Sequence, residues 1–136
     1  MIAVPGKRNV TGISRELIKT IMEVSKSSHP DEFAALLREE KGVINELVFV
    51  PGTISDEGSA LMFLHNMPID LSIVGSVHSH PVHDFRYSDA DLHMFGSKGT
   101  YNIIAAYPYR ETDWVCYNPK GTQITLPVVD DPKGGG

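Results

Sequence analysis

An apolar run that ends in two histidines is the feature that most constrains this chain. Residues 71–77 read Leu-Ser-Ile-Val-Gly-Ser-Val, and a short apolar run of this kind is typical of a buried β-strand. His78 and His80 follow directly. Because side chains two residues apart on a strand lie on the same face, we expect both imidazoles to point toward one place at the end of this strand.

A carboxylate follows the histidines at a short distance. Ser88 is expected to open a short helix, and Asp91 lies in its first turn. A serine followed three residues later by an acid is also typical of a helix capping box. The two interpretations are compatible, because the serine can cap the helix while Asp91 turns toward the histidines. Two imidazoles and one carboxylate form a common catalytic zinc shell with a fourth position for water, so the pattern predicts a Zn²⁺ site of the hydrolase type.

The composition is that of a single ordinary domain. The chain has 136 residues, of which 41% are hydrophobic and 21% charged, and it is long enough to bury a core without disulfides. The formal net charge of −5 argues against nucleic acids and anionic membranes as partners, since both select basic surfaces. The sequence lacks an apolar stretch of the roughly 20 residues that span a bilayer and the apolar core of a signal peptide. With a single cysteine, Cys116, it fits a reducing compartment, and we expect a cytoplasmic protein.

The first third of the chain predicts a helix and then a segment of open assignment. Ser14 is a good helix cap, the apolar residues of 17–22 recur at helical spacing, and Pro30 is expected to end the helix. By propensity alone, residues 32–38 favour another helix. The Lys-Gly turn that follows and the strand expected at 43–50 favour the other arm of a hairpin instead.

The remainder of the chain predicts further strands. Four segments have the apolar pattern of short strands: 60–65, 101–107, 112–117 and 122–128. The last two are joined by Asn-Pro-Lys-Gly at 118–121, which is typical of a type I turn. We divide the chain into an N-terminal extension (1–13), a single domain (14–129) and a flexible tail (130–136).

The functional residues together resemble a known motif. The spacing is His-x-His, seven residues, Ser, two residues, Asp, and it is joined to an upstream Glu32. It resembles the JAMM motif of the MPN-plus (Jab/MPN) zinc metalloproteases, and is most similar to their short stand-alone archaeal members. The resemblance covers roughly residues 14–129. It implies an α/β, three-layer MPN domain like the cytidine deaminases, with a mixed central sheet and flanking helices, and it assigns 32–38 to a strand.

The resemblance also implies the role of each residue. His78, His80 and Asp91 correspond to the Zn²⁺ ligands, Glu32 to the general base and Ser88 to the donor that stabilises the oxyanion. The implied activity is a zinc-dependent isopeptidase that cleaves the bond between the C-terminal Gly-Gly of a ubiquitin-like modifier and a lysine amine. A glycine-rich tail could add as a strand to an open sheet edge, for which residues 59–63 are our candidate.

Two alternatives share the motif. One is a JAMM hydrolase that processes the C-terminus of a sulfur-carrier protein ending in Gly-Gly, and the other is a noncatalytic MPN interaction scaffold. A deaminase is excluded, because that chemistry uses a Pro-Cys-x-x-Cys signature and the chain has one cysteine. The sequence leaves open the physiological modifier, the linkage specificity, the need for an activating partner and the oligomeric state, including a homodimer. It also leaves open the role of the glycine tail at 134–136.

The remaining candidates receive ordinary interpretations. His83 is expected to be solvated, His29 and His65 to be structural or exposed, and His93 to point away from the ligand face. Cys116 lies in an alternating strand pattern, where a buried free cysteine is common.

Overall fold

The computed structural model describes residues 10–49, 72–89, 91–92 and 100–130. The strand expected at 60–65, the sheet edge expected at 59–63 and His93 lie outside these residues, as do most of the N-terminal extension and most of the C-terminal tail. Among the described residues, no helix is both long and apolar enough to cross a bilayer.

Helix α1 (Arg15–Ser28) begins and ends where the sequence predicts. The Ser14 hydroxyl accepts a hydrogen bond from the Leu17 N–H at 3.2 Å, which is the expected N-cap. At the other end the His29 N–H donates to the Ser25 carbonyl at 3.0 Å, directly before the proline. The buried face of the helix consists of Leu17, Ile18, Ile21, Met22 and Ser25.

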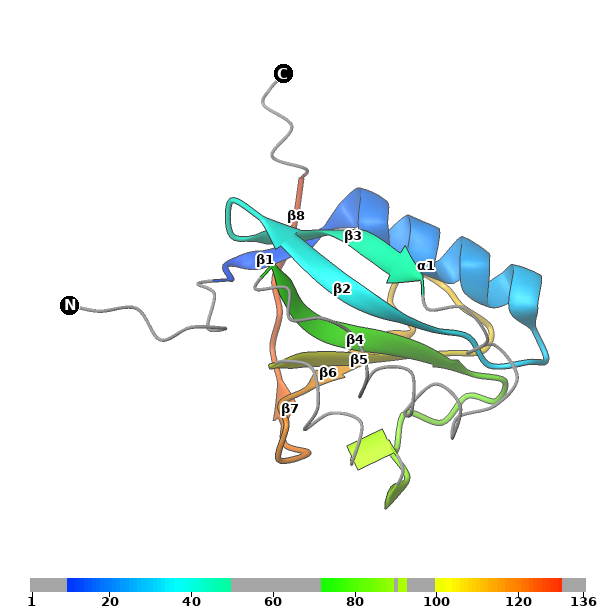
Figure 1. Ribbon diagram of the computed structural model, residues 1–136. Helices are drawn as coiled ribbons and strands as arrows, with labels where there is room; N and C mark the ends of the chain where they lie inside the picture. Colours follow the sequence, from blue (N-terminus) through cyan, green and yellow to red (C-terminus); the bar gives the residue numbers. More distant parts are fainter. Residues whose placement is uncertain (1–9, 50–71, 90, 93–99, 131–136) are drawn as a thin grey trace.

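Eight strands in the described residues form one mixed sheet. They are β1 (Gly12–Ser14), β2 (Ala34–Glu40), β3 (Val43–Phe49), β4 (Ile73–His80), β5 (Tyr101–Ala106), β6 (Trp114–Tyr117), β7 (Gln123–Ile124) and β8 (Val128–Val129). Their order is β7-β6-β5-β4-β2-β3-β1-β8. The β4–β5, β1–β3 and β1–β8 pairs are parallel, and the other pairs are antiparallel. Figure 1 shows the resulting sheet with α1 on one side.

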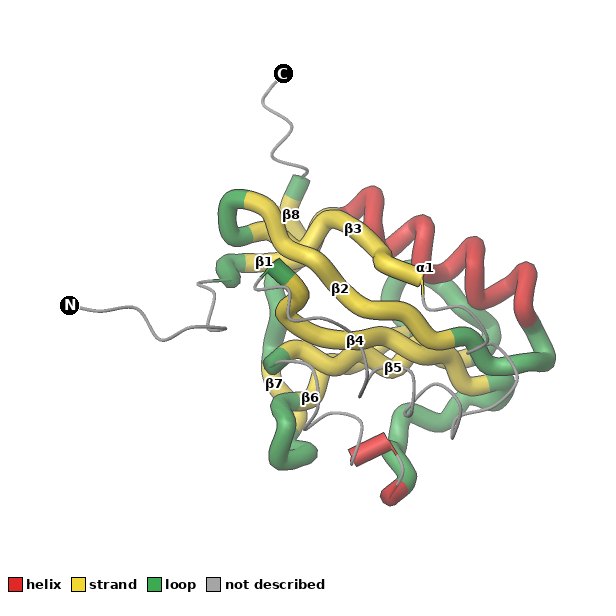
Figure 2. The backbone as a smooth tube through the Cα atoms, in the orientation of Figure 1, coloured by secondary structure: helices red, strands yellow, loops and turns green. Residues whose placement is uncertain are grey.

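The sheet is strongly curled, as its connections require. β7 and β8 lie at opposite edges, and eight flat strands would separate them by about 34 Å. Only residues 125–127 connect Ile124 to Val128, a link that reaches at most about 14 Å. The two edges must therefore approach each other. The curl is visible in the tube of Figure 2, where α1 crosses one face of the sheet.

The open assignment of 32–38 resolves to a strand. β2 pairs with β3 on one side and β4 on the other, and this double pairing overrides the helical propensity of its residues. Lys41 and Gly42 join β2 to β3 with φ values of 54° and 86°. A two-residue hairpin with both residues at positive φ is a type I′ turn, which matches the twist of paired strands.

The fold keeps β4 close to its parallel neighbour β5. Gly75 pairs with Tyr101 across the two strands, and a Cβ atom at Gly75 would lie 1.6 Å from the Tyr101 carbonyl oxygen. Glycine is therefore required here, because any side chain would push β5 away from the strand that carries the two histidines.

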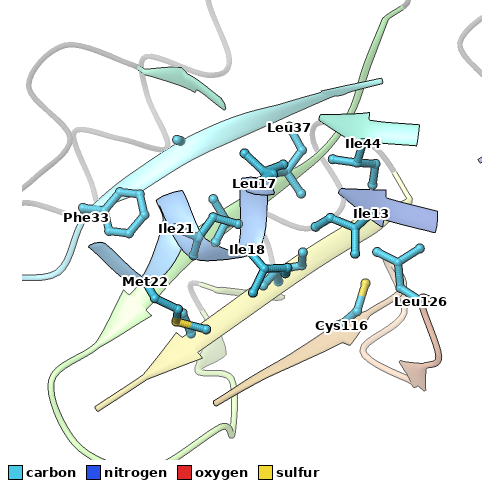
Figure 3. Packing of buried hydrophobic residues seen from close by; sticks show 14 of the residues in the cluster. Ile13, Leu17, Ile18, Ile21, Met22, Phe33, Leu37, Ile44, Cys116 and Leu126 are labelled. Carbon is cyan, nitrogen blue, oxygen red and sulfur yellow. The ribbon is translucent and has the colours of Figure 1, made fainter. Parts of the chain in front are cut away.

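The core lies between α1 and one face of the sheet. The hydrophobic core cluster includes Phe33, Ala35, Val77 and Ile103 from the sheet. Figure 3 shows the helix residues packed over the strands. His78 pairs laterally with Ala34 and Ile104, one residue out of phase with the core positions. Because side chains alternate along a strand, His78 and His80 face away from α1.

One expectation about the strands needs correction. The continuous strand predicted at 122–128 is wrong: Gln123–Ile124 pairs with β6, whereas Val128–Val129 pairs with β1. Pro127 interrupts the pattern, and Leu126 between the two strands is buried. At the N-terminal side, Gly12 opens β1 and Ile13 is fully buried.

Other expected features are present. Tyr101–Ala106 and Trp114–Tyr117 lie within the predicted ranges 101–107 and 112–117. The turn at 118–121 is confirmed by a hydrogen bond from the Gly121 N–H to the Asn118 carbonyl at 2.9 Å.

Candidate metal centre

The two histidines at the end of β4 converge as their spacing predicts. His78 is 3% exposed and His80 is partly buried. Their Nε2 atoms lie 3.2 Å apart. A shared strand face thus places both imidazole nitrogens at one point.

Asp91 completes the group from the short helical segment that begins after Ser88. The Ser88 N–H donates to Asp91 Oδ2 at 2.8 Å, and the Asp91 N–H donates to the Ser88 hydroxyl at 3.1 Å. This reciprocal pair is the predicted capping box. It turns the buried carboxylate toward the histidines: Oδ1 lies 3.1 Å from His78 Nε2, and Oδ2 lies 3.7 Å from His80 Nε2. Capping and metal ligation are therefore compatible in one residue.

The geometry of these donors fits zinc. His78, His80 and Asp91 each offer a ligand atom within 4.8 Å of the others. Tetrahedral zinc at about 2.0–2.1 Å from its ligands holds neighbouring ligand atoms about 3.3–3.4 Å apart. The observed separations of 3.1, 3.2 and 3.7 Å lie around this value. Two imidazoles and a carboxylate are also donors that zinc commonly takes in catalytic sites.

The His80 ring is held in the orientation that ligation requires. Its Nδ1 lies 2.7 Å from the Asp84 carbonyl oxygen. A carbonyl only accepts, so Nδ1 carries the proton and Nε2 presents its lone pair. Burial lowers the pKa of His80, but the hydrogen bond with Asp91, the bond to Asp84 and the charges of Asp91 and Glu32 together raise it. The surroundings thus favour positive charge at this point, as a metal site must.

Glu32 lies beside the histidines on the same side of the sheet. Ala34 pairs with His78 in the antiparallel β2–β4 ladder, so Glu32, two residues earlier, lies next to His80 on the face away from α1. Its side chain is exposed. An open cleft of about 430 Å³ is lined by Glu32, His80, Asp84, Arg86, Tyr87, Ser88 and Asp91. Glu32 and Ser88 therefore share one solvent-accessible space with the candidate ligands.

Tyr109 supports this arrangement from the loop after β5. Its hydroxyl donates to the His80 carbonyl at 3.1 Å and lies 2.9 Å from His29 Nδ1, which therefore donates to it. Tyr109 is 2% exposed and has a φ of 66°, an uncommon backbone conformation for an aromatic residue. His29 is thus a structural residue, as expected, whereas His83 is exposed and contacts the Tyr107 carbonyl.

The structure adds residues that sequence reasoning missed. Asp84 contributes its carbonyl to His80 and its carboxylate to Arg86, whose Nε and Nη2 lie 3.0 and 2.8 Å from it. The Arg86 guanidinium holds the pKa of Asp84 well below its ordinary value. Neither residue nor Tyr109 belongs to a spacing motif, because their roles arise from loop geometry and contacts between distant segments.

Comparison with known proteins identifies the family. A family model described as prokaryotic homologs of the JAB domain matches residues 14–117. The chain belongs to this JAB family. The chain is also 38% identical over 133 residues to a Haloferax volcanii protein named "Probable metalloprotease", and the match covers 90% of this chain and 82% of that protein.

Two solved structures are similar to the fold described above. A JAB1/MPN domain protein from Archaeoglobus fulgidus has a TM-score of 0.73 and 46% identity, covering 88% of this chain and 99% of that one. A structure described as "JAMM: A Metalloprotease-like Zinc Site in the Proteasome and Signalosome" has a TM-score of 0.72 and 43% identity, covering 89% and 99%. The α/β architecture of the JAB/MPN domain is thereby confirmed. The chain carries a JAMM-type, metalloprotease-like site whose His78, His80 and Asp91 fit Zn²⁺.

Proposed function

We propose that this JAB protein is a zinc-dependent isopeptidase that hydrolyses the bond between the C-terminal Gly-Gly of a ubiquitin-like modifier and a lysine amine. The observation that carries the proposal is the shared cleft. Glu32 and Ser88, which have the two remaining roles in the reaction, line the same open space as His80 and Asp91. An extended tail without side chains at its last two positions suits an open cleft beside a sheet.

His78, His80 and Asp91 would hold the zinc ion. When bound, zinc supplies a Lewis acid that polarises a carbonyl group and lowers the pKa of water to about 7. The protein contributes the fixed orientation of its ligands, through the Asp84 carbonyl on His80 and the Ser88 N–H on Asp91.

Glu32 is the proposed general base. Its exposed carboxylate lies next to His80 and inside the cleft, where it can take a proton from the attacking water. It then gives this proton to the leaving lysine amine, so that the base returns to its starting state. This cycle needs no covalent intermediate.

Ser88 is the proposed donor to the developing oxyanion. Its hydroxyl oxygen accepts the Asp91 N–H at 3.1 Å, and this bond leaves the hydroxyl's own proton for another acceptor. Donation to the substrate oxygen as it becomes negative would stabilise the transition state more than the ground state.

The alternatives make different demands on these residues. A noncatalytic scaffold would need neither a metal triad nor a carboxylate beside it, and this chain has both. Processing of a sulfur-carrier C-terminus would use the same residues on a different leaving group.

A comparison of two substrates tests the proposal. The protein is incubated with a Gly-Gly conjugate on a lysine side chain and with a Gly-Gly carrier extended by a C-terminal cysteine, each with and without a zinc chelator. We expect chelator-sensitive cleavage of the lysine conjugate. Cleavage of the cysteine adduct alone would replace the proposal with carrier processing. If the zinc-loaded protein cleaves neither substrate, the noncatalytic scaffold is favoured.

Glu32→Gln tests the base separately. We expect the variant to retain zinc and to lose activity by about 10²- to 10⁴-fold, the usual contribution of a general base. Glu40→Gln is the matched control, because Glu40 is exposed at the far end of β2, the strand that begins two residues after Glu32. The activity of this variant should equal that of the wild type. Activity of Glu32→Gln within about tenfold of the wild type would remove Glu32 from this role.

A further inference from the structure

Ser79 is a fully buried polar residue between the two metal ligands. It is 0% exposed, and its side chain lies on the core face of β4, opposite to those of His78 and His80. Its hydroxyl accepts a hydrogen bond from the Phe33 N–H at 3.0 Å. Its own N–H donates to the Phe33 carbonyl at 3.0 Å. Ser79 thus holds both polar backbone groups of Phe33.

This contact differs from an ordinary strand pair. In an antiparallel ladder, two hydrogen-bonded residues exchange both of their backbone bonds. Here the Phe33 N–H bonds to the serine side chain instead. The regular register ends at the Ala34–His78 pair, so Ser79 extends the contact between the two segments by one residue. The residue before Phe33 is Glu32.

We propose that Ser79 is a positioning residue that fixes Glu32 relative to the metal ligands. The inference rests on the role of Glu32 proposed above. Because Phe33 is held at its N–H, its carbonyl and its buried ring, which is 1% exposed, the start of the Glu32 side chain has a defined place beside His80. Without the hydroxyl, the buried Phe33 N–H would lose its acceptor, and the segment would shift to recover one. A displacement of about 1 Å in a reacting group can cost about 100-fold in rate.

Ser76 provides a matched control on the same strand. It is 1% exposed, and its hydroxyl donates to Asn102 Oδ1 of β5 at 2.9 Å. Removing either hydroxyl breaks one buried hydrogen bond of β4, but only Ser79 bonds to the residue that follows Glu32. The two alanine variants therefore separate general damage to the strand from displacement of the base.

The first experiment compares Ser79→Ala, Ser76→Ala and Ser79→Thr by zinc content, urea midpoint, KM and kcat on a Gly-Gly-lysine conjugate. Both alanine variants should bind one zinc ion and lose similar stability. We expect Ser79→Ala to lower kcat by about 10- to 100-fold with little change in KM, and Ser76→Ala to change kcat by less than about threefold. Ser79→Thr, which keeps the hydroxyl, should restore kcat. Equal kcat values for the two alanine variants, or loss of zinc from Ser79→Ala alone, would overturn the inference.

A double-mutant cycle tests whether Ser79 acts through Glu32. In a Glu32→Gln background, Ser79→Ala should lower the residual rate by less than about twofold, because the group it positions is already absent. A full further loss would show that Ser79 acts otherwise and would overturn the inference. Normal activity of Glu32→Gln itself would instead refute the proposed base. If Ser79→Ala does not fold, Ser79→Cys replaces it: sulfur is a weak acceptor, and an unchanged kcat in that variant would equally refute the role of the hydroxyl.

Discussion

Two buried aspartates, Asp91 and Asp113, have the same local geometry but different partners. They are 2% and 3% exposed. Each accepts a backbone N–H from the residue three positions earlier: Ser88 donates to Asp91 at 2.8 Å, and Arg110 donates to Asp113 at 2.7 Å. A short turn is thus sufficient to aim a carboxylate into the protein at two unrelated places.

The difference lies in the group that faces the carboxylate. The Arg110 guanidinium contacts Asp113 through Nε at 2.9 Å and Nη2 at 3.2 Å, and its hydrogen bonds lower the pKa of Asp113. Asp91 instead faces the imidazoles of His78 and His80, which are neutral when they bind a metal. A buried carboxylate needs a compensating positive charge. At Asp113 the chain supplies a permanent positive charge, that of Arg110. The two histidines and Asp91 instead suit a cation that can exchange.

The strongest test of this comparison is the same substitution at both sites. Asp91→Asn should abolish zinc binding and lower activity by more than about a thousandfold, because the amide is a poor substitute for an anionic ligand. Asp113→Asn should keep both zinc and kcat. Metal analysis and hydrolysis assays on the two variants decide the question, and a full complement of zinc in Asp91→Asn would refute the ligand assignment.

Zinc removal should loosen the segment around Asp91 and leave the turn around Asp113 unchanged. A ligand at a thousand times its dissociation constant stabilises a fold by about 4 kcal/mol, so a chelator should lower the unfolding temperature of the wild type but not that of Asp91→Asn. Amide exchange localises the effect. The Leu92 N–H, which donates to the Ser88 carbonyl, should exchange faster without zinc, whereas the Asp113 N–H, which donates to the Arg110 carbonyl, should not change. Equal acceleration at both amides would contradict the comparison.

Asp113→Asn should mainly affect stability. Loss of the charged partner of Arg110 should lower the stability by less than loss of a fully buried pair would, because the guanidinium is exposed to solvent. Because folding lowers the pKa of Asp113 from the ordinary 3.8, its ionised form stabilises the native state above that value. This contribution is lost as the pH falls through the lowered pKa. The free energy of unfolding of the chelated wild type, measured with urea, should therefore fall over this acidic range. The same free energy should depend less on pH in Asp113→Asn. A variant with the same pH dependence as the wild type would assign the effect to other carboxylates.

Cys116 should give the smallest effect. This side chain is 1% exposed and lies in the apolar core, where burial raises the pKa of its thiol to about 12. The Cys116 thiol, which is a buried acid without a compensating cation, thus stays neutral. Cys116→Ala should change activity by less than about twofold, and the native thiol should react with alkylating reagents only as fast as the protein unfolds. Rapid labelling of the folded protein would contradict this assignment.

The three metal ligands that the sequence predicted depend on short-range geometry, whereas Glu32 was assigned through the family resemblance. The alternation of strand side chains brings His78 and His80 together, and the capping box aims Asp91. Both relations involve residues within a few positions of each other, so spacing is sufficient. Ser79, Asp84 and Tyr109 were missed because the groups they contact are determined by loop shape or by segments distant in the sequence, such as Phe33, 46 residues before Ser79.

The same distinction applies to the fold. Helix α1 and the turn at 118–121 follow from local signals, caps and prolines. Propensity alone would have placed residues 32–38 in a helix, because it does not include pairing with strands on both sides. The division of 122–128 between two sheet edges was also missed, since it depends on the curl of the whole sheet.

The pairing of the first strand with the last determines where the protein can be attached to other molecules. Ser14 and Val129 lie opposite each other in the β1–β8 pair, and two further strands separate β1 from the strand that carries the histidines. A carrier domain or surface tether joined through either end would therefore pull on the same short edge pair. Mechanical load would reach that edge before it reached the strand that carries the histidines.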